Sequence, residues 1–422
     1  MTLSQLFVPL LNELQSQIWP QALQLVIAFA PILVAVILYT IFWSVWVKFV
    51  RAQYFLSLKY SVLEIRLPKE SFKSPKAMEL FLNAFHNTVE GNFIKKYWDG
   101  EVRPWFSLEL VSIEGQVKFI IWTRSQLKAF IESSLYAQFP GIEIREIEDY
   151  TKSVHYDPKE IKTWFCEFKF AQNDAYPIKT YVDYGLDKDP KEEFKVDPLV
   201  PLLEFLGSVG PNQQVWIQIL IQAHTEDKTI LGKWFKKEDK WKKDAKKIVN
   251  EIMLRDSKTK VSGIKDEETG FTKLPTISSG EKDIVDAIER SQTKYAFDAG
   301  IRAIYIAKKE MYNPSNIGGI VGNMKHFSSP HLNGFKLGSS WLPKIEYPWQ
   351  DFNNFRKNKY SRLVLAAYKR RSYFHPPFKC KPMILNTEEL ATIFHFPGQV
   401  AGTPTLERVP SKKAEAPSNL PI

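Results

Sequence analysis

The chain has 422 residues, 44% of them hydrophobic and 14% aromatic, so beyond the first 50 or so it can build the cores of about two ordinary domains. A formal net charge of +10 favours an anionic partner, such as nucleic acid, lipid headgroups or an acidic protein. The two cysteines, Cys166 and Cys380, lie far apart, which fits a reducing compartment and excludes a metal site built on cysteine spacing.

The longest apolar stretch covers residues 22–47, beginning at Ala22, and it holds one Gln, two hydroxyl residues and no charge. At about 1.5 Å per residue such a helix crosses a hydrocarbon core of about 30 Å, and Pro31 is tolerated where a neighbour takes up the freed carbonyl. Tyr39, Trp43 and Trp46 gather at one end, as interfacial aromatics do. A cleaved signal peptide fits less well, because the stretch is long, no basic region precedes it and no small-residue cleavage site follows.

The charges that flank this stretch predict its orientation. Lys48, Arg51 and Lys59 follow it, whereas only Glu13 precedes it, and the positive-inside rule then places the bulk of the chain in the cytoplasm. Residues 1–54 are therefore predicted to be an amphipathic segment and a single-pass anchor in the inner membrane. The amphipathic segment is expected either on the outer surface of the bilayer or against a partner's helix.

Residues 55–152 carry the pattern of a first α+β module. Alternation predicts a strand from Leu58 to Leu67, and Ser74-Pro75 then opens a helix as N-cap and first-turn residue. Further alternation at 106–110 and 117–121, around a turn at Glu114-Gly115, predicts a hairpin.

The module ends with a second helix and a last strand. Thr123 and Gln126 have the spacing of a capping box at a helix start, and alternating Ile residues predict a strand within 142–147. The order β-α-β-β-α-β is that of the ferredoxin-like, or split βαβ, arrangement.

Residues 153–330 repeat this order of elements less regularly. Strands are predicted at 164–170, Ile178–Val182, 215–221 and 301–307. Helices are predicted to start at Asp197-Pro198, Glu281 and Asn313-Pro314. The expected fold class is therefore α+β, with a transmembrane helix followed by tandem ferredoxin-like modules and a Lys-rich helical insertion.

The insertion covers residues 225–280 and combines clustered lysines with a sparse apolar stripe, which predicts a helix that projects from the sheet. Its candidate phosphate-binding residues are Lys236, Lys237, Lys242, Lys243, Lys246 and Lys247. A solvated helical face without a ligand is the alternative. Residues 256–280 have the composition of a mobile loop.

Residues 331–405 form a basic, aromatic-rich segment, and residues 406–422 have the composition of a linker or tail. Interleaved aromatic and basic side chains are typical of a channel for single-stranded nucleic acid. The candidate phosphate-binding residues are Arg356, Arg362, Arg370 and Arg371. The alternative is that the aromatic side chains pack in a core while the cations face water.

No motif with catalytic spacing is found in the sequence. The stretch nearest to a P-loop, residues 318–326, has the wrong glycine spacing and no hydroxyl after its lysine, so it reads as a helix and its C-cap. The seven histidines are scattered, and paired acids occur no more often than chance allows. We therefore expect no enzyme, no catalytic residue, no metal and no cofactor.

Several short runs, taken together, carry a resemblance to a known family. They are Leu67-Pro68-Lys69, Ser74-Pro75 and residues 105–110, 119–123, 132–140, 207–219, 386–397 and 416–422. With the preceding span, these resemble the membrane-anchored amino-terminal part of the TraG/VirD4 and VirB4-like ATPases of type IV secretion and conjugation. In that family such a region leads into a P-loop translocase domain, whose motif positions do not occur in this sequence.

The resemblance implies a role rather than a reaction. It implies a non-catalytic, membrane-anchored component that seats a separate P-loop ATPase at the cytoplasmic face. Its candidate partners are membrane lipid, the ATPase and further copies of the chain in a homo-oligomer. A membrane-tethered protein that binds nucleic acid through its basic segments is the alternative.

Overall fold

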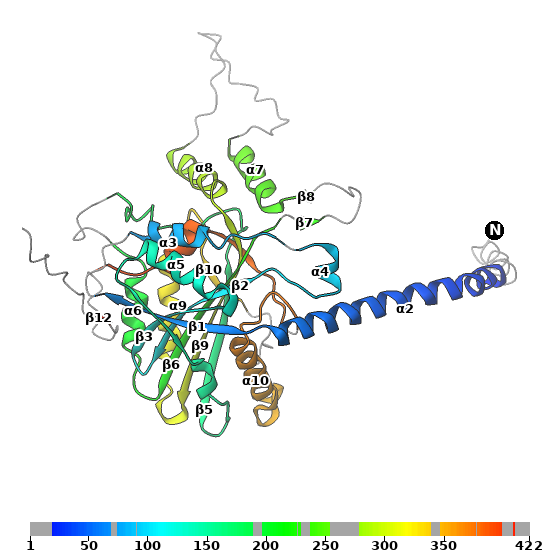
Figure 1. Cartoon of the computed structure of the whole chain (residues 1–422), viewed down its shortest axis with the longest axis horizontal. Helices are drawn as coiled ribbons and strands as arrows, with labels where there is room; N and C mark the ends of the chain where they lie inside the picture. The colour runs from blue at the N-terminus through cyan, green and yellow to red at the C-terminus, as the bar shows by residue number, and fades with distance from the viewer. Residues whose placement is uncertain are drawn as a thin grey trace, which may run out of the picture. The chain divides into compact units, whose positions relative to one another are not determined.

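The computed structural model describes residues 19–68, 74–89, 91–188, 196–225, 227–228, 237–253, 278–338, 347–376, 378–398 and 408–409. The chain forms two compact units (Figure 1). The smaller unit consists of Met1–Leu58 with Glu90–Val102, and the larger one of Lys59–Val89 with Arg103–Ile422. The predicted amphipathic segment at the start of the chain lies outside the described residues.

The smaller unit is built on helix α2 (Trp19–Ser57), which contains the whole predicted span. Within it, Ile27–Ser57 is long and apolar enough to cross a membrane. A signal sequence would meet the same criteria of length and composition. A short helix, α4 (Phe93–Tyr97), packs against α2 and was not expected from the sequence. Asn92 caps α4 by accepting a hydrogen bond from the Lys95 N–H at 2.8 Å.

The larger unit contains one sheet in which the strands follow the order β10-β5-β9-β6-β2-β3-β1-β12 (Figure 1). Strand β4 also pairs with β1, and β11 with β9; all these pairs are antiparallel except the short parallel pair of β1 with β12. The strands are β1 (Tyr60–Pro68), β2 (Trp105–Ile113), β3 (Gln116–Arg124), β4 (Glu143–Ile147), β5 (Ile161–Phe170), β6 (Gln213–Ala223), β9 (Ala296–Lys308), β10 (Phe335–Gly338), β11 (Met383–Asn386) and β12 (Arg408–Val409).

The first half of the sheet follows the predicted order of elements. Helix α3 (Pro75–Asn83) connects β1 to β2, and α5 (Lys128–Gln138) connects β3 to β4, which gives the spatial order β4-β1-β3-β2. Ser74 is the N-cap of α3 as predicted. The capping box at Thr123 is wrong: β3 continues to Arg124, a 3₁₀ turn follows, and α5 begins at Lys128 without a side-chain cap.

The second half has the spatial order β10-β5-β9-β6, with α6 (Val200–Gly207) after β5 and α9 (Ser315–Met324) after β9. The strand predicted at Ile178–Val182 is wrong, because this stretch is irregular and leads into a turn, and the N–H groups of Ile178 and Tyr181 donate to side chains of α11 (Thr387–Ile393). Residues 318–326 lie in α9 and the turn after it, as predicted.

Between β6 and β9 the chain forms two further helices, α7 (Lys240–Ile252) and α8 (Ser279–Gln292). Buried residues of both helices share a small apolar cluster with Ala175, which is separate from the main core. A two-stranded ribbon of β7 (Asp227–Lys228) and β8 (Lys237–Glu238) precedes α7. The insertion thus contains a helix, α7, which packs on α8 through its apolar stripe, and most of the loop predicted at 256–280 lies outside the described residues.

The two faces of the sheet differ because alternate residues point to opposite sides. One face is apolar, and residues of α3, α5, α6, α9 and α11 belong to its core cluster. The other face bears Glu109, Gln218 and Arg302, which lie beside one another on β2, β6 and β9. Helix α10 (Phe355–Lys369) covers this polar face through contacts with Gln218 and Arg302.

Candidate functional site

The predicted anchor residues lie on one helix, as expected. Pro31 and Tyr39 are exposed side chains in the middle of α2, whereas Trp43 and Trp46 are partly covered by α4. Lys48 is exposed and Arg51 is half-buried. The backbone of Ala22 is helical, and its side chain lies outside the described part of the structure.

Beneath α10, three polar residues of the sheet form a buried row across the junction of its two halves. Glu109 accepts a hydrogen bond from the Gln218 side-chain amide at 2.7 Å, and Gln218 in turn accepts one from Arg302 Nε at 2.6 Å. Arg302 also donates to the backbone carbonyl of Ala367 at the end of α10, at 2.9 Å. The row therefore ties both halves of the sheet to the segment that follows them.

Arg371 completes this network and differs from the sequence expectation. Its side chain is completely buried, where it forms an ion pair with Glu109 at 3.0 Å and a second one with Asp149. Burial lowers the pKa of the Arg371 guanidinium, but Glu109, Tyr150 and Asp149 outweigh burial and raise it well above its usual range. Arg371 is thus a structural cation that is closed off from a phosphate at the surface, because carboxylates already occupy its donors.

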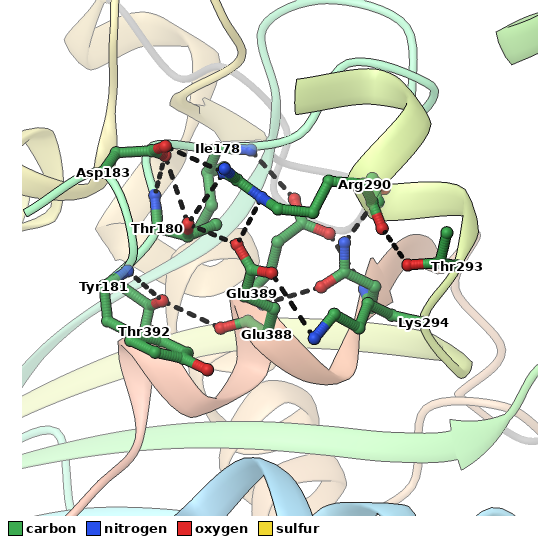
Figure 2. Close-up of polar contacts among 12 residues, drawn as sticks. Ile178, Thr180, Tyr181, Asp183, Arg290, Thr293, Lys294, Glu388, Glu389 and Thr392 are labelled. Carbon is green, nitrogen blue, oxygen red and sulfur yellow. Dashed lines mark hydrogen bonds and ion pairs between the residues drawn. The ribbon is translucent and has the colours of Figure 1, made fainter. Parts of the chain in front are cut away.

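A second polar network lies where α8, α11 and the turns at 178–183 meet (Figure 2). Arg290 of α8 reaches Asp183 at 2.8 Å and Glu388 of α11 at 3.1 Å, and Thr180 donates its hydroxyl to Glu388 at 2.6 Å. Lys294 forms an ion pair with Glu79 of α3 at 2.6 Å. Ion pairs from α8 thus reach α11 and the turns at 178–183, and Lys294, two residues after α8, reaches α3.

Glu389 sits in the same network and has an unusual electrostatic environment. Its carboxylate accepts the N–H groups of Ile178 and Asn386, each at 2.9 Å, within a capping box at the start of α11. Burial raises the pKa of Glu389 to about 8, although these two N–H groups act in the opposite direction. Burial likewise raises the pKa of Glu388 despite Thr180 and Arg290.

Two histidines are also held by carboxylates. Burial disfavours the charged form of His224, but Asp298 at 2.6 Å and Asp239 at 3.5 Å outweigh it and raise the pKa of the imidazole. Asp239 is the N-cap of α7, so His224 links the insertion to the sheet. His395 and Asp197 form a comparable pair at 2.9 Å, and Asp197 raises the pKa of His395 against the effect of burial.

The other candidate phosphate-binding residues divide into two surface groups. Lys242, Lys243, Lys246 and Lys247 are exposed on α7. Arg356 and Arg362 are exposed on α10, and Arg370 is exposed just after it. Lys236 and the side chain of Lys237 lie outside the described residues.

Near the start of α10, aromatic side chains accompany the exposed cations. Trp349, Phe352 and Phe355 are exposed by 67%, 81% and 71%. By contrast, Tyr368 and Tyr373, further along the segment, are fully buried. Packing of the aromatic residues in a core therefore applies to the end of this segment, whereas its start presents them to solvent, and nucleic-acid binding there stays a prediction.

The chemistry of these networks is mainly that of paired, buried charges. Each buried carboxylate described above has a cationic or N–H partner, which is what burial of charge requires for stability. Across the described ranges, no group of three or more His, Cys, Asp or Glu side chains is arranged to hold a metal ion. The sequence did not single out Glu109, Gln218, Arg302, Arg290 or Glu389, because an alternating or capping pattern does not reveal which polar residues become covered.

Comparison with known proteins gives a family but no activity. A search of curated proteins finds no match to this chain. Residues 56–408 match the family described as domain of unknown function (DUF8128), a region that begins at the end of α2 and reaches β12. That description assigns no secretion role. Since the match covers most of the sequence, the chain belongs to the DUF8128 family.

Proposed function

We propose that this protein is a non-catalytic, single-pass component of the inner membrane that seats a separate P-loop ATPase of a type IV secretion or conjugation-like apparatus. The bulk of the chain is then cytoplasmic, in agreement with the positive charges that follow the span. Membrane lipid is the first partner, the ATPase the second, and further copies of the chain a third.

The observation that carries the anchoring part of this proposal is the packing at the end of α2. Trp46 donates its indole N–H to the Tyr97 carbonyl at 3.1 Å, and Val50 is buried beside Gly100. If α2 belonged to a cleaved signal peptide, Tyr97 and Gly100 would lose these contacts. This supports a retained helix whose remaining apolar surface, exposed from Ile27 to Phe49, contacts lipid.

The larger unit fits a scaffold made of two related modules. We infer that each half of the sheet is a ferredoxin-like module. Numbered within its own half, each has the spatial strand order 4-1-3-2, as β4-β1-β3-β2 in the first half and β10-β5-β9-β6 in the second. The two second strands, β2 and β6, pair over nine residues and join the halves into one sheet. Such a platform offers broad surfaces for a partner and supports a role in assembly.

The proposal is tested by extraction and capture from membranes. The full chain should stay in the membrane fraction after alkaline carbonate and dissolve only with detergent. Crosslinking in intact membranes, followed by mass spectrometry, should then recover a protein with Walker motifs. Release by carbonate would overturn the anchoring, whereas crosslinked membranes that repeatedly yield no Walker-motif protein would overturn the ATPase role.

A second candidate function is the binding of single-stranded nucleic acid at the start of α10. The exposed Trp349, Phe352 and Phe355 beside Arg356 and Arg362 favour it, because stacking and phosphate contacts act together in such sites. Binding to an oligonucleotide should weaken steeply with salt and fall at least tenfold in Phe352→Ala/Phe355→Ala. The matched control replaces four exposed lysines of α7 with Gln: Lys242, Lys243, Lys246 and Lys247. If binding falls only in this control, the site does not lie on α10.

A further inference from the structure

The segment 91–102 leaves the larger unit and packs on α2 as an aromatic cluster. Trp43 of α2 contacts Tyr97 and Trp98, with ring centroids 5.5 and 6.0 Å apart. Phe93 contacts the same two residues at 4.7 and 6.1 Å. No pattern in the sequence indicates a role for Phe93, Tyr97 or Trp98.

This cluster remains open on its outer side. Phe93, Ile94 and Trp98 are exposed by 61%, 62% and 52%, which is unusual for three large apolar side chains within one short segment. Phe42 and Phe49 of α2 are also more than half exposed, and their rings contact Trp46, which donates its indole N–H to the Tyr97 carbonyl. Exposed apolar side chains therefore occur on both elements, near the place where they meet.

The position of Trp43 along α2 fixes the level of this surface in a bilayer. At about 1.5 Å per residue, Trp43 lies about 24 Å from Ile27, which is close to the far boundary of a hydrocarbon core about 30 Å thick. Lys48 and Arg51 follow within about two turns and mark the headgroup region. Since Tyr97 and Trp98 contact Trp43 directly, α4 lies at the same level.

We propose that α4 and Trp98 form a second membrane contact, which inserts into the interfacial layer of the bilayer beside α2. This inference rests on the proposed anchoring of α2. Aromatic side chains are favoured at that depth, where their rings meet acyl chains and their polar atoms reach water. The contact gives the anchor a fixed rotation about its axis, because α4 covers one side of the helix and the bilayer must accept both elements together.

The glycines of the segment are suited to this arrangement. Gly100 has a φ of +72°, and a Cβ atom there would lie 2.6 Å from the backbone oxygen of Val50. Only glycine therefore allows the segment to return so close to α2. This close approach sets the depth of the aromatic residues relative to the helix.

The test places nitroxide labels on the full chain in vesicles of phosphatidylcholine and phosphatidylglycerol. Ile94→Cys reports on the segment, Tyr39→Cys on an exposed site of the span one helical turn before Trp43, and Lys152→Cys on an exposed site of the larger unit. The native Cys166 and Cys380 are buried, and the labelled wild-type chain measures their background. Accessibility to oxygen, which concentrates in lipid, is compared with accessibility to a water-soluble nickel complex.

We expect the ratio of oxygen to nickel accessibility at position 94 to be several-fold higher than at position 152 and lower than at position 39, as an interfacial depth requires. A lipid-like ratio at 39 with a water-like ratio at 94 would overturn the membrane contact while the anchoring stands. Low accessibility to both reagents at 94 would also overturn it, since a protein surface would then cover the segment. A water-like ratio at 39 would overturn the anchoring itself.

Discussion

Arg371 and its neighbour Arg370 have opposite environments, so their replacement should have very different energetic effects. Arg371→Met leaves Glu109 buried without its cation and should lower the free energy of unfolding by about 3–5 kcal/mol. Arg370→Met, at an exposed site, should change it by less than about 0.5 kcal/mol. Urea unfolding of the full chain in detergent, followed by near-ultraviolet circular dichroism, measures both changes. Equal effects in the two variants would contradict a structural role for the buried pair.

Glu389 should make the folded state less stable as the pH rises. Its pKa in the folded state is raised to about 8 from an ordinary value of 4.5. Its contribution to the free energy of unfolding is therefore fully present below pH 4.5 and is lost as the pH rises to 8. A difference of one bound proton corresponds to about 1.4 kcal/mol per pH unit at most. Urea midpoints between pH 5 and 9 should therefore decline in the wild type, and the decline should be smaller in Glu389→Gln.

Glu281 provides the matched control for this experiment. It occupies the same capping-box position at the start of α8, but it is exposed, and hydrogen bonds from Ser278 lower its pKa. Its contribution is present above pH 4.5 and is lost only as the pH falls below that value, so Glu281→Gln should leave the slope between pH 5 and 9 unchanged. A slope that is equal in Glu389→Gln and the wild type would contradict the role of Glu389.

At the scale of residues, the sequence could not reveal which polar side chains become buried. Glu109 and Gln218 alternate with apolar neighbours in β2 and β6, a pattern that indicates a solvent-facing side of a sheet. Glu109 is buried against Tyr150 and Arg371, and Gln218 against the end of α10, so segments outside these strands cover that side. Arg371 was assigned to phosphate for the same reason, since basic composition does not distinguish a covered cation from a free one.

At the scale of elements, α4 depends on the close approach of Gly100 to α2. Gly100→Ala adds a Cβ against the Val50 backbone and forces a side chain into positive φ, at a cost of more than about 1 kcal/mol. The segment should loosen, and trypsin should cleave faster after Lys95 and Lys96 in the detergent-solubilised chain.

Gly91→Ala is the control in the same segment. Gly91 also has a positive φ, but its nearest neighbours are atoms of the flexible Lys95 and Glu101 side chains. Cleavage should therefore increase less than in Gly100→Ala. If both variants were cleaved at the same rate, the backbone contact with Val50 would not hold the segment.

Elements with strong local signals were predicted well, and those that depend on distant partners were not. The Ser74 cap and the turn at Glu114-Gly115 are confirmed, because a capping hydroxyl and two positive φ values are set by a few adjacent residues. The strand predicted at 178–182 is wrong, because side chains of α11 accept the N–H groups of Ile178 and Tyr181 in place of a sheet neighbour. The helix α4 was missed because five residues give too little periodicity.

At the scale of the whole molecule, the pairing of β2 with β6 should make the larger unit unfold as one. Leu108 and Ile219 lie opposite each other in this pair, and both are buried in the core cluster. Leu108→Ala should lower the free energy of unfolding by about 2–5 kcal/mol, and Ile219→Val by about 0.5–1.5 kcal/mol. In each variant the larger unit should still unfold in a single transition, with a lower midpoint. Hydrogen exchange in α5 and in α9, which belong to different halves, should respond equally to either change. A response confined to one half would contradict a single cooperative unit.

The two halves of the sheet also close their central hairpins over very different lengths of chain. Strands β2 and β3 are joined by Glu114-Gly115 alone, whereas β6 and β9 are joined by residues 224–295, although the His224 N–H and the Ala296 carbonyl lie only 2.9 Å apart. By loop length alone, closing the longer connection costs about 3 kcal/mol more in chain entropy. We therefore expect β2 and β3 to form before β9 during refolding. Pulse-labelled hydrogen exchange would measure this order, and earlier protection of β9 amides would refute it.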